Sequence, residues 1–294
     1  MGVPKMSHKG VGRRTGRFLY DWGKIQRRCA VDSPRTLAQA EPMGMVIDTI
    51  NYFPVKGLNA HRLARTTLRA DRPIANDRRF ALTRGGPTGA NDHARWRNKG
   101  HFLQLARHPK LAKLTSHYDD AQEVLTIYRQ AHAVSRGQIT NPLGRTLIEG
   151  FFTAYLGDTL SGPPKLIDGG DISFSDQRTP LISLINAASV RDLERIVDAP
   201  LAVDRFRGNL VIEGARPWAE LEWVGQTITI NGARLAVIDR IERCAAINVD
   251  PTDGHHDGNL LRALEGGFGH RFCGVLLRVV TGGSIAQADA AELQ

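Results

Sequence analysis

Residues 45–52 read Met-Val-Ile-Asp-Thr-Ile-Asn-Tyr, and this stretch sets the expectation for the fold. Its β-branched and aromatic residues are typical of a strand, which Pro54 closes. Similar short runs follow after turn-rich segments at residues 62–69, 79–83 and 123–128. Short strands with frequent turns favour a small barrel or sandwich.

Two helical patterns and a second group of strands come next. Asn141 and Pro142 predict a helix start, and apolar residues then recur at helical spacing up to Gly157. The apolar spacing predicts a second helix from about Pro180 to Val197. Further strands are expected at 210–213, 227–230, 235–241 and 275–280, with a hairpin signal at Asn231-Gly232. The chain is therefore expected to be mainly β with a few helices, an α+β protein.

Composition and charge limit the classes of function. The 294 residues are 41% hydrophobic and 23% charged, which is typical of a globular protein, and no apolar run approaches the roughly 20 residues of a membrane span. The formal net charge is +9, but residues 1–41 hold nine Lys/Arg against three Asp/Glu. The rest of the chain carries little excess charge, so we expect no nucleic-acid partner.

The basic segment 1–42 has no strand or helix periodicity. Its composition predicts a disordered extension, and an over-called start codon would give the same pattern. An Arg-rich, acid-poor segment is also compatible with an organelle transit peptide, whereas the apolar core of a secretory signal is missing. We expect a cytoplasmic protein, with organelle targeting as the alternative.

The cysteines are Cys29, Cys244 and Cys273, an odd number with wide spacing. This favours a reducing compartment over a disulfide framework. The sequence has no covalent haem motif and too few thiols for a four-cysteine iron–sulfur cluster. A redox centre in this chain would therefore need electrons from outside.

Cys244 is the candidate for chemistry because it follows a strongly apolar strand and lies close to Arg240 and Arg243. A cysteine beside a strand is most often a small core residue. Nearby guanidinium groups favour the thiolate, which attacks electrophiles or binds metals.

A second candidate segment is Asp204–Asn209, which brings Arg205, Arg207 and an amide together just before a strand. A guanidinium fits a phosphate or the oxygens of a flat heterocycle. The alternative interpretation of this segment is a solvated surface turn.

Five motifs in order resemble one family. They are Tyr-Phe-Pro-Val-Lys at 52–56, Asn-Asp-Arg-Arg-Phe at 76–80, Ser-Phe-Ser-Asp at 173–176, Phe-Arg-Gly-Asn at 206–209, and Arg243-Cys244 followed by Val-Asp-Pro at 249–251. Together they resemble MOSC-domain proteins with an N-terminal MOSC β-barrel domain, including the mitochondrial amidoxime reducing component and its bacterial relatives. The similarity covers about residues 44–294 and implies an N-terminal MOSC β-barrel domain at 43–134 and a MOSC domain at 135–294.

The resemblance also implies a molybdenum cofactor, Mo-molybdopterin. Cys244 would be the catalytic residue and would give its thiolate to the metal, a soft ligand that suits it. Pyridoxal phosphate is an unlikely cofactor because no strand-borne lysine has a clear pyridinium partner. The resemblance assigns the cofactor contacts to Lys56, Gly57 (serine in eukaryotic members), Arg79, Thr179, Arg205, Arg207, Asn209, Arg243 and Asp250.

The implied activity is reduction of small N-hydroxylated or N-oxide compounds. Electrons would come from an external protein, a flavoprotein reductase with a ferredoxin or cytochrome b5-type donor. The alternative is a carrier of molybdenum cofactor, or of sulfur as a Cys244 persulfide. Glu220 could support the site, and His270 either closes the substrate side or has a structural role.

Overall fold

The computed structural model describes residues 44–85, 95–256 and 258–294, and the statements below refer to this part of the chain. The extension predicted at residues 1–42 lies outside the described residues. Strands dominate the described chain and three α-helices accompany them, which confirms the expected mainly β fold.

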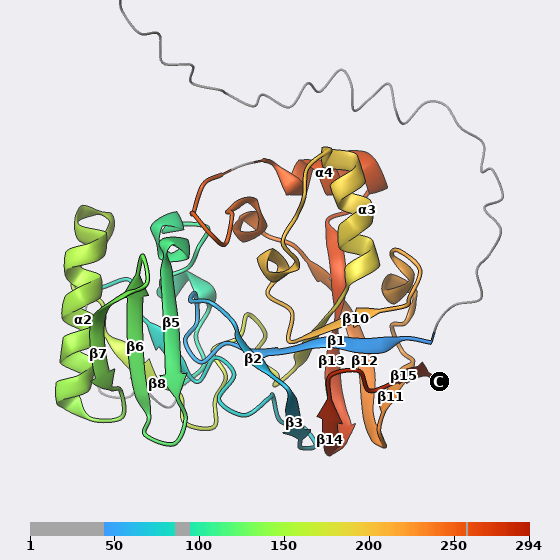
Figure 1. The fold of residues 1–294 in the computed structure, drawn as a ribbon, viewed down its shortest axis with the longest axis horizontal. Coiled ribbons are helices and arrows are strands. Elements are labelled where there is room, and N and C mark those ends of the chain that lie inside the picture. Colours follow the sequence, from blue (N-terminus) through green and yellow to red (C-terminus); the bar gives the residue numbers. More distant parts are fainter. Residues whose placement is uncertain (1–43, 86–94, 257) are drawn as a thin grey trace, which may run out of the picture. The chain divides into compact units, whose positions relative to one another are not determined.

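An eight-stranded sheet, in the order β15-β11-β12-β13-β9-β10-β1-β2, forms the largest element. Figure 1 shows β1 running alongside β10, and β12 alongside β13. Only the β9–β10 pair in this sheet is parallel. The strands are β1 (Val46–Tyr52), β2 (His61–Leu63), β9 (Ile182–Asn186), β10 (Leu210–Glu213), β11 (Thr227–Ile230), β12 (Ala233–Glu242), β13 (Phe272–Thr281) and β15 (Ala291–Leu293).

The first strand joins the later half of the chain. β1 pairs with β10 in antiparallel register, with Ile50 opposite Leu210, and both side chains are buried in the core of the sheet. A second link is the pairing of β3 (Arg65–Leu68) with β14 (Gly283–Ala286). Residues Phe53–Lys56 follow β1 directly, and their backbone bonds to residues 78–80. The division into domains at residues 134 and 135 stays a prediction.

A separate three-stranded sheet follows, with α2 (Pro142–Leu156) beside β7, as Figure 1 shows. Asn141 caps α2 by accepting a hydrogen bond from the Gly144 amide at 2.8 Å, as its sequence predicts. Ile148 and Phe152 on the helix are buried with strand residues. The strands are β5 (Leu114–Asp119), β6 (Val124–Arg129) and β7 (His132–Gln138), while β4 (Phe80–Leu82) pairs separately with β8 (Leu166–Asp168).

Two further helices, α3 (Ala187–Val197) and α4 (Leu260–Phe268), lie side by side (Figure 1). Their apolar faces share a buried cluster with Phe206 and Ile247. This cluster anchors the segment that follows the candidate cysteine through Ile247. No helix in the described residues is both long and apolar enough to cross a membrane.

The predicted helix at 180–197 is wrong in its first part. Ile182–Asn186 form strand β9, between β13 and β10, and the helix begins only at Ala187. The central strand is covered on both faces, so its continuous apolar run resembles one side of a helix. Asn186 marks the change, since its side chain accepts a hydrogen bond from the Ala188 amide at 3.1 Å.

Candidate functional site

Cys244 is the accessible thiol in the described part of the chain. It is partly exposed, whereas Cys273, the other described cysteine, is buried. Burial raises the pKa of the Cys273 thiol to about 12, so this group stays neutral at ordinary pH. Of these two described cysteines, Cys244 is therefore the one suited to chemistry that needs a thiolate.

The backbone around Cys244 is well anchored. The Arg243 amide donates to the Arg271 carbonyl at 2.9 Å, which prolongs the β12–β13 pairing to the residue before the cysteine. Cys244 then starts a single 3-10 turn, η7 (Ala245–Asn248), in which the Ile247 amide donates to the Cys244 carbonyl at 3.2 Å. Ile247 is buried, so the turn that carries the thiol is fixed to the core.

Arg243 supports this turn rather than facing open space. Its guanidinium donates to the Phe206 carbonyl at 2.9 Å and, through Nε, to the Cys273 carbonyl at 2.7 Å. Burial lowers the pKa of Arg243, while the nearby Cys273 and Cys244 oppose that shift. The donors of Arg243 are therefore occupied by backbone carbonyls.

Arg205 and Asp250, both predicted cofactor contacts, bind each other. Arg205 Nη2 lies 3.0 Å from Asp250 Oδ2, and Nη1 donates to the Ile247 carbonyl at 3.1 Å. The Arg205 side chain is 1% exposed. The pair connects η5 (Val203–Phe206) to the turn that follows Cys244. Both residues therefore stabilise the backbone next to Cys244.

A cluster of cations lies around the ring of Phe53. The guanidinium carbons of Arg78 and Arg207 lie 4.5 and 4.3 Å from the ring centroid. Arg78 Nη2 donates to the Arg207 carbonyl at 3.2 Å, and Arg207 Nη1 donates to the Leu58 carbonyl at 2.7 Å. Arg207 has a left-handed φ of 52°.

The charges in this cluster oppose one another. Burial lowers the pKa of Arg207 to about 9, and repulsion by Arg78 adds to the shift. Burial also lowers the pKa of Lys56, although Asp176 at 2.6 Å counteracts it. An anionic ligand would stabilise the charged forms of both side chains.

Asp176 connects this cluster with the cysteine. One carboxylate oxygen accepts from Lys56, and the other lies 3.4 Å from Lys99 Nζ. Burial lowers the pKa of Lys99, but the charges of Asp176 and Cys244 raise it overall. Sequence reasoning missed Lys99, because no motif marks it and its partners are distant in the chain.

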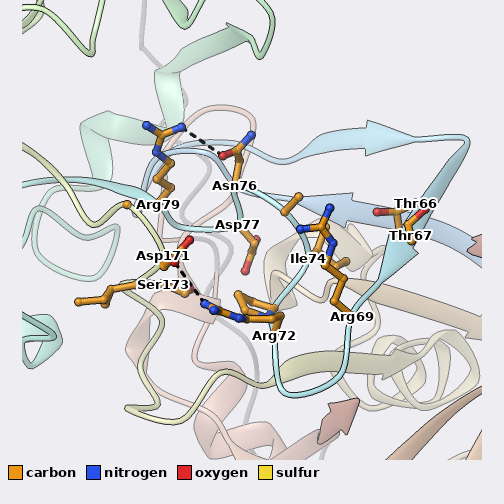
Figure 2. Close-up of a pocket in the computed structure, with 14 residues that line it drawn as sticks. Thr66, Thr67, Arg69, Arg72, Ile74, Asn76, Asp77, Arg79, Asp171 and Ser173 are labelled. Atoms are coloured by element: carbon orange, nitrogen blue, oxygen red, sulfur yellow. Dashed lines mark hydrogen bonds and ion pairs between the residues drawn. The ribbon is translucent and has the colours of Figure 1, made fainter. Parts of the chain in front are cut away.

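Arg79, a predicted cofactor residue, points elsewhere. Its guanidinium makes two hydrogen bonds of 2.9 Å to Asp168 and lies 3.3 Å from Glu123. It lines a pocket of about 500 Å³, shown in Figure 2 with Asn76 beside it. The structure brings its neighbour Arg78 to the cation cluster instead.

Asn209 uses its whole side chain to join three strands. Its Oδ1 accepts from the Ser183 amide at 3.1 Å and hydroxyl at 2.8 Å, while Nδ2 donates to the Asn51 carbonyl at 3.2 Å. The residue is 1% exposed. The structure thus gives this predicted cofactor contact a scaffold role.

Replacing Asn209 by alanine is expected to destabilise the chain by roughly 2–4 kcal/mol, because buried partners would lose their hydrogen bonds. Urea unfolding measures this. Thr179→Ala, at an exposed position, serves as control and should change stability by less than about 0.5 kcal/mol. An Asn209 variant as stable as the parent would refute the scaffold role.

Gly57 and Thr179 contribute little side-chain chemistry. Gly57 has a φ of 88°, and a Cβ there would lie 2.8 Å from the Leu103 carbonyl oxygen. This position therefore favours glycine, and only its backbone can serve a ligand. Thr179 is exposed three residues after Asp176.

Glu220 and His270 have structural partners. Glu220 is fully buried and accepts hydrogen bonds from Asn186 and Ser189, each at 2.9 Å. His270 packs edge-on against Trp218, with ring centroids 5.4 Å apart. Neither residue has a described contact with Cys244.

The residues present fit an anionic, metal-bearing cofactor. The cations Lys56, Lys99, Arg78 and Arg207 face Asp176 and Asp77, and a third nearby carboxylate, Asp204, is paired with Arg62. This excess of positive charge suits a phosphate monoester, which carries about two negative charges at neutral pH. Cys244 adds a soft ligand at the edge of the same cluster.

Two family models match consecutive segments of the chain. The MOSC N-terminal beta barrel domain matches residues 44–148, and the MOSC domain matches residues 169–292. The chain belongs to the MOSC-domain family. In this MOSC protein, Lys56 and Lys99 come from the first matched segment and Cys244 from the second. The candidate site therefore draws on both.

Two curated relatives are named molybdenum cofactor sulfurases. The protein from Caenorhabditis elegans is 26% identical over 257 residues, which is 78% of this chain and 33% of the relative. The protein from Caenorhabditis briggsae is 39% identical over 84 residues, which is 28% of this chain and 12% of the relative. This MOSC protein thus spans about a third of the length of its Caenorhabditis elegans relative.

Among solved structures, the YUAD protein from Bacillus subtilis aligns with 85% of this chain and 96% of its own. Its sequence identity is 13% and its TM-score 0.41.

Proposed function

We propose that this MOSC protein binds Mo-molybdopterin through Cys244 and reduces N-hydroxylated or N-oxide compounds. The observation that carries the proposal is the position of a partly exposed thiol beside cations that outnumber their carboxylate partners. Lys56, Arg78 and Arg207 would hold the phosphate and pterin oxygens. Cys244 would supply the protein thiolate to the metal.

The metal, when bound, would supply reversible two-electron chemistry and an acceptor for oxygen. The protein keeps the cofactor's charge compensated and its thiolate ligand fixed. The overall reaction breaks the N–O bond of the substrate. Two electrons and two protons enter, and the oxygen leaves as water.

The electrons require a partner protein in this proposal. With three cysteines and no covalent haem motif, the chain does not encode a four-cysteine cluster or a c-type haem. A flavoprotein reductase with a ferredoxin or cytochrome b5-type donor would meet the need. NADH alone should therefore not drive turnover.

A second candidate is sulfur transfer, favoured by the names of the curated relatives. Cys244 would carry a persulfide, receive the outer sulfur from a donor persulfide and pass it to an acceptor. The thiolate is regenerated at the end, so the step needs no net oxidant. The partial exposure of Cys244 allows both transfers.

An artificial donor distinguishes the two functions. We expect dithionite-reduced viologen to drive conversion of benzamidoxime to benzamidine and water by the molybdenum-loaded protein, as followed by chromatography. Cys244→Ala, carried through the same loading, reports unspecific reduction. Loaded protein with no turnover above that variant on any N-hydroxylated substrate would refute the reductase. A Cys244 persulfide detected by mass spectrometry would then support the carrier.

A further inference from the structure

Lys99 and Lys56 contact different oxygens of the Asp176 carboxylate. It begins the 3-10 turn η2 (Lys99–His101), which Asn98 caps by accepting from the Gly100 amide at 2.9 Å. Lys99 Nζ lies 3.4 Å from Asp176 Oδ2, and Lys56 Nζ lies 2.6 Å from Oδ1. The carboxylate is therefore held between two ammonium groups.

The two lysines differ in their access to solvent. The Lys56 side chain is 9% exposed, whereas that of Lys99 is 40% exposed. Lys56 is thus the inner partner and Lys99 the outer one. Partial burial lowers the pKa of Lys99, but Asp176 and Cys244 outweigh it and raise the pKa overall. Lys99 therefore remains a cation beside Asp176.

Arg243, the residue before Cys244, has little freedom to move when the charge at Cys244 changes. Arg243 donates to the carbonyls of Phe206 and Cys273, so its guanidinium is fixed by backbone. Lys99 has a flexible side chain and a compact charge, so its ammonium can adjust its position relative to the Cys244 sulfur. A thiolate at Cys244 together with Asp176 would balance the charges of Lys56 and Lys99. Asp77 pairs with Arg78, so Arg207 would then be left to an anionic ligand.

We propose that Lys99 is a positioning residue of the Cys244 site, where its ammonium compensates the thiolate and holds Asp176 against Lys56. The inference rests on the proposed cofactor function and assigns a role to a residue outside the five motifs. Loss of the ammonium leaves Asp176 with one partner and the thiolate without its adjustable counter-charge. Cofactor retention and the electronic state of the metal should both respond.

The test compares Lys99→Met and Lys99→Arg with Lys113→Met, an exposed lysine on another segment. We expect Lys99→Met to lose molybdenum roughly threefold to tenfold faster on dilution, because a partly exposed charge pair is lost. In the fraction that stays loaded, the molybdenum EPR signal should change and the reduction potential should fall, since a nearby positive charge favours the reduced state. Lys99→Arg should restore most of each property, and Lys113→Met should match the parent.

The outcomes separate this inference from the cofactor proposal. If the parent protein retains molybdenum while Lys99→Met matches it in retention, EPR signal and potential, the role of Lys99 is refuted. A Lys99→Met variant that loses molybdenum only because it melts much lower, with unchanged EPR signal and potential, also contradicts it. If the parent itself never binds molybdenum, the proposed function fails instead.

Discussion

Replacing Cys244 by serine is expected to remove molybdenum and to lower viologen-driven turnover at least about a hundredfold. A serine hydroxyl stays protonated near neutral pH and is a hard ligand, whereas the proposed protein ligand is a soft thiolate. Elemental analysis and the benzamidoxime assay measure the two effects. The turn at 244–248 should persist, because its hydrogen bonds are made by backbone.

Cys273→Ala provides the matched control for Cys244→Ser. Cys273 is buried, and its thiol stays neutral because its pKa is raised to about 12. This variant should melt at a lower temperature but keep the metal. Full molybdenum content and turnover in Cys244→Ser would show that the thiol is not the ligand.

Arg207→Ala is expected to weaken cofactor retention roughly tenfold to a hundredfold, because a charged hydrogen bond in a partly buried site is worth about 1.5–3 kcal/mol. The thermal stability of the cofactor-free chain should fall less than cofactor retention does, since burial and Arg78 already lower the pKa of Arg207. Lys56→Ala should behave similarly. Dialysis followed by molybdenum analysis gives retention, and thermal melting of the cofactor-free chain gives stability.

Arg62→Ala is the control for Arg207→Ala. Arg62 pairs with Asp204 at 3.0 Å, and both side chains are about half exposed, so little stability should be lost. Its molybdenum retention should equal that of the parent. Arg207 and Lys56 variants that hold molybdenum normally but melt far lower would make these residues structural.

The fold was predictable where local patterns dominate. The strand at 45–52 and the helix after Asn141 follow from side-chain type and capping. The stretch 180–197 was misassigned because a strand buried on both faces carries the apolar run that a helix also carries. Strand β7 escaped prediction since most of its residues are exposed or partly exposed at a sheet edge.

The candidate site was predictable by residue type but not by role. Lys56 and Lys99 share the Asp176 carboxylate, with Arg207 and Cys244 among the charges that act on these lysines; their roles toward a cofactor stay predictions. Arg205, Asp250 and Asn209 instead bind other protein groups, because the donors that suit a cofactor also suit carbonyls and carboxylates.

The positions of Arg78, Arg79 and Lys99 could not be predicted from the sequence. Nothing local distinguishes Arg78 from Arg79, and only the folded chain places Arg78 at Phe53 and Arg79 at Asp168. Lys99 became a candidate only through its contact with Asp176, which lies 77 positions later in the chain. Such pairings depend on tertiary contacts, so sequence patterns do not reveal them.

The most direct test of the central claim is the molybdenum and pterin content of the protein, purified from a host that makes the cofactor. Elemental analysis and fluorescence of the oxidised pterin give both values on one sample. One molybdenum and one pterin per chain are expected. The content of both should be lower in Arg207→Ala. Protein purified from such a host with neither molybdenum nor pterin would contradict the account.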